Sequence, residues 1–282
     1  MSQVRQSSRP AFRGRVRWIF LVCIALYAVA GIGCASFQRK LIYYPPVLTS
    51  EQVDKLARAA NVERWMSASG ERIGLKRFSP RQPAEGQLLM LYGNSGCAVA
   101  CAHYADVIQQ AVSLDVFIVE YPGYADRRGS PSQSSLFRAA DEALRSLATN
   151  RPIFLLGESL GTGVAVYLAG SYPDNIAGVV LLAPYNRLTD VAQHHVLLLP
   201  AGLLLVDRFP SQDYLRNYRG PVAMLVAGKD RVVPEKFGRR LYASYDGPKH
   251  LWEFPSRDHE SVMIQPPEFW TQVVDFWRTN RR

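Results

Sequence analysis

Residues 151–173 constrain the fold of this chain more than any other stretch of its sequence. They begin with a short apolar run, Ile153–Leu156, which is typical of a buried strand. The sequence GESLG, Gly157–Gly161, follows at once, and the pattern is then helical up to Pro173. A strand, a G-x-S-x-G turn and a helix in this order predict that the hydroxyl of Ser159 is presented beyond the edge of a sheet. An ordinary turn between a strand and a helix is the alternative interpretation.

The two glycines of this turn have a physical explanation. A sharp turn from strand to helix strains the backbone at the serine, and side chains two residues before or after it would clash. The helix directs its N-terminus towards the serine. The backbone N–H of Leu160 is therefore predicted to face an oxyanion that develops there.

The basic charge of the chain is concentrated near its N-terminus. The 282 residues are 48% hydrophobic and 20% charged, which suits one large globular domain with an additional segment. The net charge is +9, but residues 1–50 contain seven basic residues and no acidic one, so only +2 remains for the rest. The basic charge therefore belongs to this segment, and the sequence predicts no nucleic-acid-binding module.

Residues 18–35, WIFLVCIALYAVAGIGCA, contain no charge and follow the basic segment 1–17. Their length is at the lower edge of a membrane span, and a basic segment before an apolar run is also typical of a secretory signal. Three interpretations stay open: an uncleaved signal-anchor, a signal cleaved near Cys34–Ala35, and a lipoprotein signal with Cys34 lipidated. Each predicts an extracytoplasmic domain, because positive charge stays inside.

Strands and helices alternate along residues 37–282. The expected strands are 73–78, 88–92, 116–120, 153–156, 179–182, 222–227 and 251–254, and the expected helices include 51–60, 97–112, 134–148 and 267–278. Residues 37–46 are expected to be extended, because Pro45–Pro46 forbids helix. The alternation predicts one α/β domain with a mostly parallel, doubly wound sheet.

Residues 186–213 interrupt this alternation. They are too apolar for a surface loop, and we interpret them as a helical cap over an acyl-binding pocket, with ordinary core helices as the alternative. His194 and His195 lie in this segment. Adjacent side chains on a helix do not converge on one ion, and no C-x-x-C or H-E-x-x-H motif accompanies them, so no metal site is predicted.

Three residue types needed for acyl transfer by a serine occur in a consistent order. The hydroxyl must lose its proton as it attacks, an imidazole accepts that proton, and a carboxylate holds the imidazole in the required tautomer. Ser159, Asp230 and His259 each follow a predicted strand, and the carboxyl ends of parallel strands gather at one edge of a sheet. Asp207 and Asp213 are the competing acids, but both lie in the predicted cap.

The loop after strand 88–92 is the second candidate for oxyanion binding. It reads Tyr92-Gly93-Asn94-Ser95-Gly96, and the backbone N–H of Asn94 or Ser95 is the expected donor. A simple loop between strand and helix is the alternative.

Cys97 and Cys101 are the two cysteines outside the N-terminal segment. Their spacing places them on one face of the predicted helix, but the Cβ vectors of such a pair are poorly set for a disulfide. We predict two free thiols packed as small apolar groups.

Several motifs together resemble the membrane-anchored α/β-hydrolases, often grouped with serine-aminopeptidase-like or prolyl-oligopeptidase-like hydrolases. They are FQRKLIYYPP at 37–46, YGNSG at 92–96, YPGY at 121–124 with GSPS at 129–132, GESLGTG at 157–163, DRFPS at 207–211, AGKDRVVP at 227–234 and DHES at 258–261. The resemblance implies an α/β-hydrolase fold with Ser159 as nucleophile, Asp230 as acid and His259 as base. Such relatives usually have a histidine where this chain has Tyr92, which leaves the backbone donors in place but bears on loop packing and substrate choice.

The resulting hypothesis is a membrane-tethered serine hydrolase that cleaves a lipophilic carboxylic ester or thioester. Its expected partners are a small acyl substrate and, through residues 18–35, a membrane. A serine peptidase and a catalytically silent scaffold that binds a lipid or a protein are the alternatives. No cofactor is expected.

Overall fold

The computed structural model describes residues 10–198 and 200–280, except for the side chains of residues 10–16, 28, 30–32 and 34–36. Its helices are α1 (Pro10–Ile42), α2 (Ser50–Ala59), α3 (His103–Ala111), α4 (Gln133–Arg145), α5 (Leu160–Ser171), α6 (Leu188–His195), α7 (Ala201–Leu204), α8 (Ser211–Leu215), α9 (Glu235–Ser244) and α10 (Pro267–Asn280), with a 3₁₀ turn at Ala100–Ala102. Its strands are β1 (Glu63–Met66), β2 (Arg72–Arg77), β3 (Gly86–Leu91), β4 (Leu114–Val119), β5 (Ile153–Glu158), β6 (Ile176–Leu182), β7 (Val222–Ala227) and β8 (Lys249–Phe254).

The eight described strands form one sheet in the order β1-β2-β4-β3-β5-β6-β7-β8. Six neighbouring strands, β4, β3, β5, β6, β7 and β8, run parallel. β2 pairs antiparallel with β4, and β1 pairs antiparallel with β2. The predicted mostly parallel sheet is confirmed. Every residue of β3, β4 and β7 is buried, as expected of strands that helices cover on both faces.

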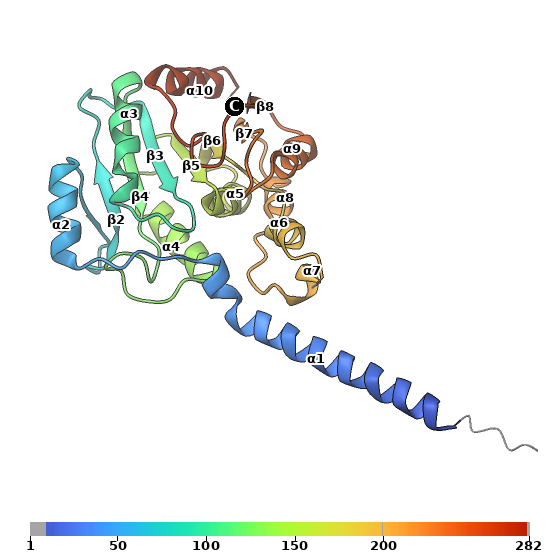
Figure 1. Cartoon of the computed structure of the whole chain (residues 1–282). Coiled ribbons are helices and arrows are strands. Elements are labelled where there is room, and N and C mark those ends of the chain that lie inside the picture. The colour runs from blue at the N-terminus through green and yellow to red at the C-terminus, as the bar shows by residue number, and fades with distance from the viewer. Residues whose placement is uncertain (1–9, 199, 281–282) are drawn as a thin grey trace, which may run out of the picture.

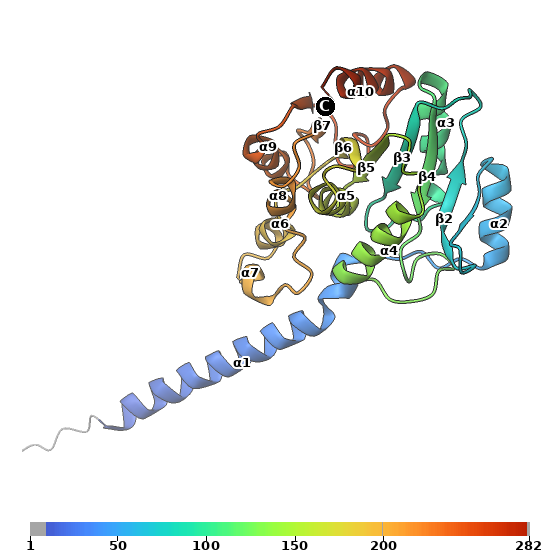
Figure 2. The same cartoon turned by 180° about the vertical axis from the view of Figure 1, so that it is seen from behind.

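Helices lie on both faces of the sheet (Figures 1 and 2). α3 and α10 pack together on one face, and α4, α5, α8 and α9 cover the other. Because the central strands are parallel, their carboxyl ends share one edge. α6 and α7 lie at this edge, and so does the end of α1 (Figure 1).

The end of α1 differs from the sequence-based expectation. Residues 37–46 were expected to be extended, but α1 continues as a helix to Ile42 before the chain reaches Pro45. The expectation was wrong for residues 37–42, because a proline restricts mainly the residue before it and not residues three or more positions upstream. The short strand β1 was not predicted, since its sequence ERWM offers neither a long apolar run nor a clear alternation.

The N-terminal segment is only partly described. Within the part of the chain that the structure describes, no helix is long and apolar enough to cross a membrane. Residues 1–9 and several side chains of 18–35, including that of Cys34, lie outside the described residues. The anchor, cleaved-signal and lipoprotein interpretations therefore stay predictions.

Candidate active site

Ser159 occupies a strained turn between β5 and α5. Its φ is +48° and its ψ is −116°, a conformation that L-residues rarely adopt. A Cβ at Gly157 would lie 2.7 Å from the Cα of Thr162, and one at Gly161 would overlap the carbonyl oxygen of Leu91. Both positions therefore need glycine, which is the reason that the sequence analysis gave for them. The turn presents the Ser159 hydroxyl at the carboxyl edge of the sheet.

His259 lies between Ser159 and Asp230 and is hydrogen-bonded to both. Its Nδ1 is 2.6 Å from Oδ2 of Asp230, and its Nε2 is 3.0 Å from Oγ of Ser159. An acceptor-only carboxylate at Nδ1 requires the proton there, so Nε2 is left as the acceptor for the serine hydroxyl. Three loops that follow β5, β7 and β8 thus bring together the three residues selected from the sequence.

Asp230 is held in place by the start of its own loop. Its Oδ1 accepts hydrogen bonds from the backbone N–H groups of Val232 and Val233, at 2.8 and 2.7 Å. The other oxygen is thereby directed at His259, and the aspartate side chain is almost completely buried. Buried carboxylates are stable as ions only when such donors satisfy them.

The competing acids have other partners. Asp207 is bonded to Arg39 and to the hydroxyl of Tyr43, and Asp213 is paired with Arg187 and Arg216. Neither is hydrogen-bonded to His259, so Asp230 is the carboxylate that orients the imidazole.

The two candidate oxyanion donors both line a pocket beside Ser159. Leu160 and Asn94 lie on its wall, and neither backbone N–H has a hydrogen-bond partner among the described residues. The carbonyl of Asn94 accepts from Tyr44 N–H at 3.0 Å and from the Tyr124 hydroxyl at 2.8 Å. This loop is therefore fixed by contacts on its far side, while its N–H remains available.

The pocket itself has a volume of about 420 Å³ and is lined mostly by apolar side chains. Its size is within the range of small-molecule sites. Residues of α6, α7 and the loops beside them form one wall, and residues at the end of α1 form another. The lining comprises Gln38, Leu41, Ile42, Tyr44, Asn94, Ser159, Leu160, Tyr185, Leu188, Val191, Ala192, His195, Val196, Ala201, Leu204, Leu205, Val232 and Val233.

The end of α1 joins residues 204–206 to the loop of Asn94. Gln38 donates to the carbonyl of Leu204 at 3.3 Å and accepts from the N–H of Val206 at 2.7 Å. Four residues later, the carbonyl of Ile42 accepts a hydrogen bond from the side chain of Asn94 at 3.0 Å. The sequence analysis missed this role, because no local pattern shows that residues 38–42 contact a segment more than 160 positions later.

Tyr92 fills the position where the resemblance leads one to expect histidine. Its hydroxyl donates to the buried carboxylate of Glu120 at 2.6 Å and accepts from the N–H of Tyr121 at 3.0 Å. Glu120 is also paired with Arg72 at 3.0 Å. Burial raises the pKa of the Glu120 carboxyl, while the hydrogen bond from Tyr92 and the charge of Arg72 act in the opposite direction. Tyr92 thus fixes the strand from which the Asn94 loop departs.

Glu158 precedes the serine and is a further carboxyl at this edge. Burial raises the pKa of the Glu158 carboxyl, and the neighbouring Tyr104 and His259 act in the opposite direction. Glu158 is not hydrogen-bonded to His259, and it does not compete with Asp230 for the imidazole.

Neither the histidine pair nor the cysteines form a metal site within the described residues. His195 Nε2 is 2.9 Å from the carbonyl of Val232, and His194 Nδ1 is 3.2 Å from Lys236. Cys97 and Cys101 are buried, free thiols, which confirms the prediction made for them.

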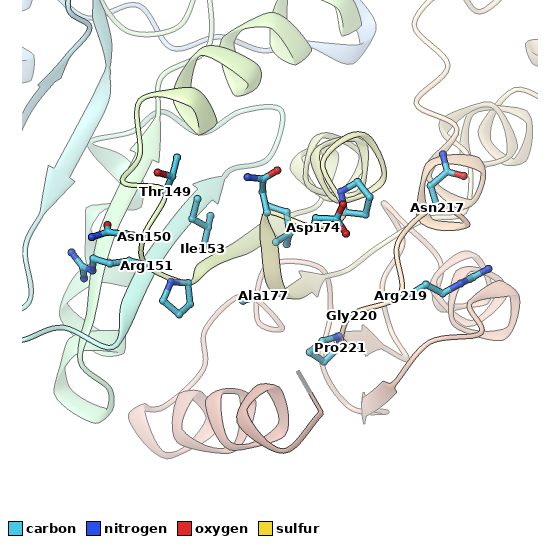
Figure 3. Close-up of a pocket in the computed structure, with 14 residues that line it drawn as sticks. Thr149, Asn150, Arg151, Ile153, Asp174, Ala177, Asn217, Arg219, Gly220 and Pro221 are labelled. Carbon is cyan, nitrogen blue, oxygen red and sulfur yellow. The ribbon is translucent and has the colours of Figure 1, made fainter. Parts of the chain in front are cut away.

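A larger hollow, of about 850 Å³, lies at the opposite edge of the sheet (Figure 3). Its walls include Thr149, Asn150, Asp174 and Arg219, from loops at the amino ends of β5, β6 and β7. Ser159, Asp230 and His259 are not among its lining residues, and size alone does not make it the site of chemistry.

Comparisons with known proteins identify the family of the fold. Residues 87–214 match a family described as having the alpha/beta hydrolase fold. An uncharacterized protein of Mycobacterium tuberculosis is 33% identical over 252 residues, which cover 85% of this chain and 88% of that protein. The alpha/beta hydrolase domain-containing protein WAV2 of Arabidopsis thaliana is 27% identical over an alignment that covers 89% of this chain and 89% of that protein. The chain belongs to the α/β-hydrolase family.

Solved structures show the same fold at low sequence identity. An esterase from Pyrococcus furiosus superposes with a TM-score of 0.61 at 14% identity, covering 86% of this chain and 98% of the esterase. A monoacylglycerol lipase from Paleococcus ferrophilus gives a TM-score of 0.54 at 20% identity, covering 77% and 98%.

Proposed function

We propose that this protein is a membrane-tethered serine hydrolase that cleaves a carboxylic ester or thioester through an acyl-enzyme. The observation that carries the proposal is the hydrogen-bonded array Ser159–His259–Asp230, with distances of 3.0 and 2.6 Å. The hydrolase class is supported by family membership and by the esterase and lipase folds that the chain resembles.

The array supplies each role that acyl transfer needs. Oγ of Ser159 attacks the substrate carbonyl carbon while Nε2 of His259 takes the hydroxyl proton, and the carbonyl π electrons move onto oxygen. Asp230 stabilises the imidazolium so formed. The tetrahedral intermediate then collapses, the bond to the leaving alcohol or thiol breaks, and His259 returns the proton to the leaving group. In the second half of the reaction, water attacks the acyl-enzyme carbonyl while His259 takes its proton. The ester bond to Ser159 then breaks, His259 returns the proton to Oγ of Ser159, and the carboxylic acid is released.

The negative oxygen of the intermediate needs donors that are already oriented. The N–H groups of Leu160 and Asn94 are the candidates, and the helix dipole of α5 adds positive potential from the Leu160 side. Removing one such donor in a serine protease costs about 10²–10³ in kcat, which indicates the contribution expected of each.

The character of the pocket favours an acyl chain over a peptide. Its lining next to Ser159 is mostly apolar, with leucine, isoleucine and valine side chains from α1, α6 and α7. A peptide would leave its own backbone N–H and carbonyl groups unpaired against such walls, whereas a hydrocarbon chain has none to satisfy.

The tether is the second part of the proposal. Trp18, Ile19, Phe20 and Leu21 of α1 are each more than half exposed, and the apolar run continues to residue 35. A helix that exposes apolar side chains around its circumference suits a lipid environment. Five arginines precede the run and only Arg39 and Lys40 follow closely, which favours an extracytoplasmic catalytic domain.

A fluorophosphonate probe and an ester series test the activity. We expect the probe to label Ser159, and the purified protein to release p-nitrophenol from esters of several acyl lengths. A protein that neither reacts with the probe nor hydrolyses any member of the series would refute the proposal and favour a binding scaffold.

A further inference from the structure

Several exposed apolar side chains occur on the loop between α6 and α7, within α7 and just after it. We define the cap tip as Val196, Leu197, Leu198, Leu203 and Val206. Leu198 is 87% exposed, and Leu197 and Leu203 are each 80% exposed. Large apolar side chains that gather on one surface usually mark a site of contact with a partner or a membrane.

The cap tip touches the helix that we propose as the tether. The hydroxyl of Tyr27 donates to the carbonyl of Leu198 at 3.1 Å. Tyr27 lies eight residues before Ala35, and a helix rises 1.5 Å per residue, so this contact is about 12 Å along the axis from the end of the apolar run. Segments that lie in a membrane interface insert to a depth of about 5–10 Å, so the contact lies close to the depth that such segments reach.

Three described backbone groups of the cap-tip loop are hydrogen-bonded to side chains. Gln193 donates from its side chain to the carbonyl of Val196 at 2.9 Å and accepts from the N–H of Ala201 at 2.9 Å. The hydroxyl of Tyr27 donates a hydrogen bond to the carbonyl of Leu198. An apolar environment favours paired backbone groups, because an N–H or carbonyl without a hydrogen bond is costly there.

Basic side chains accompany these apolar ones. Lys40 at the end of α1 is exposed, and so is Arg208, two residues after Val206; Arg39 is exposed as well but is paired with Asp207. A row of apolar residues with basic residues beside it is the pattern by which proteins bind the surface of an anionic bilayer.

We propose that the cap tip inserts into the surface of an anionic phospholipid bilayer, the same bilayer that holds α1. The proposal rests on the proposed tether and acyl-ester hydrolysis. Val196 belongs to both the cap tip and the pocket wall, and Leu204 and Leu205 of the wall directly follow Leu203. The pocket mouth therefore adjoins the lipid, and its substrate is an acyl ester that enters from the bilayer and not from water.

Lipid quenching at two matched positions tests the docking directly. The full chain, with Cys23 and Cys34 replaced by serine, is labelled with an environment-sensitive fluorophore at Leu198→Cys or Asn150→Cys. Cys97 and Cys101 are buried and stay unlabelled. Asn150 is an exposed residue of the hollow at the opposite edge of the sheet (Figure 3).

In vesicles of phosphatidylcholine and phosphatidylglycerol, we expect lipids with a nitroxide on the acyl chain to quench position 198 and not position 150. Absence of quenching at 198, or equal quenching at both positions, would overturn the proposal. Shielding of position 198 that instead depends on protein concentration in detergent would identify a second copy as the occupant, and would overturn it as well.

A substitution separates docking from catalysis. Leu198 does not line the pocket, so Leu198→Asp should leave hydrolysis of a short p-nitrophenyl ester in buffer unchanged. Hydrolysis of a long-chain p-nitrophenyl ester dissolved in vesicles should fall at least about tenfold, the lower end of what loss of one buried leucine implies. Asn150→Asp is the matched control and should change neither rate.

Equal rates for Leu198→Asp and wild type on the vesicle substrate would contradict the proposal. A wild-type protein that hydrolyses neither ester would refute the proposed function, and the quenching experiment would then still decide the docking independently.

Discussion

Replacing Asp230 by asparagine isolates the contribution of one charge. In the structure Oδ1 of Asp230 accepts two backbone N–H groups, from Val232 and Val233, and Oδ2 faces Nδ1 of His259. Asparagine is nearly isosteric, but its amide has one oxygen and one NH₂ group. The oxygen will take the place of Oδ1, because the reverse orientation would set an NH₂ donor against two N–H donors.

The NH₂ group of Asp230→Asn then faces Nδ1 of His259. That nitrogen must become an acceptor, so the imidazole proton moves to Nε2, where it can no longer accept the proton of Ser159. The same substitution in a serine protease lowers kcat by about 10⁴, or about 5.5 kcal/mol of transition-state stabilisation. We expect a loss of this order here, with KM little changed.

The assay is steady-state hydrolysis of a short p-nitrophenyl ester, with circular dichroism to verify that the variant is folded. Asp207→Asn is the matched control: this carboxylate is also buried and paired, but with Arg39 and Tyr43. A loss of less than about tenfold in Asp230→Asn would refute the tautomer argument. A larger loss in Asp207→Asn than in Asp230→Asn would assign the acid to the cap.

Three further predictions concern the nucleophile and the N-terminal segment. Ser159→Ala should abolish turnover and leave the fold intact; hydrolysis at the wild-type rate would exclude the assigned nucleophile. Gln38→Ala should release the backbone of residues 204–206 and raise KM for longer esters several-fold with kcat nearly unchanged, measured across the acyl series; a fall in kcat alone would exclude this positioning role. Deletion of residues 1–36 should give a soluble protein with full activity on short esters in buffer, and an inactive but folded product would contradict this.

The sequence carried enough information to predict the fold class and to select the three residues of the array. Ser159, Asp230 and His259 each follow an apolar run, and parallel strands gather their carboxyl ends, so local patterns sufficed to place them at one edge. The geometry at Gly157 and Gly161 follows from the same short stretch. Periodicity and turn-forming residues reflect interactions between residues that are close in sequence, so features that depend on such interactions can be predicted.

The sequence analysis did not predict the wall that α1 contributes to the pocket. Residues 37–42 were expected to be extended, because the conformational restriction by the prolines at 45 and 46 was extended too far upstream. The contacts of Gln38 with Leu204 and Val206 join residues 166 and 168 positions apart. No periodicity links such positions. Only the packing of the whole domain brings the end of α1 against the cap.

The hydrogen bonds of Gln38 can form only after residues 204–206 have been synthesised. At roughly 5–20 residues per second, a ribosome needs roughly 10–30 s to make the 168 residues between Gln38 and Val206. The residues at the end of α1 that line the pocket are thus synthesised early. Leu41 and Ile42 stay uncovered until residues 204–206 have been made. Exposed apolar side chains make a nascent chain prone to aggregation during this interval. If α1 inserts into the bilayer during synthesis, this segment is held at the membrane surface throughout the interval, whose length the synthesis rate sets.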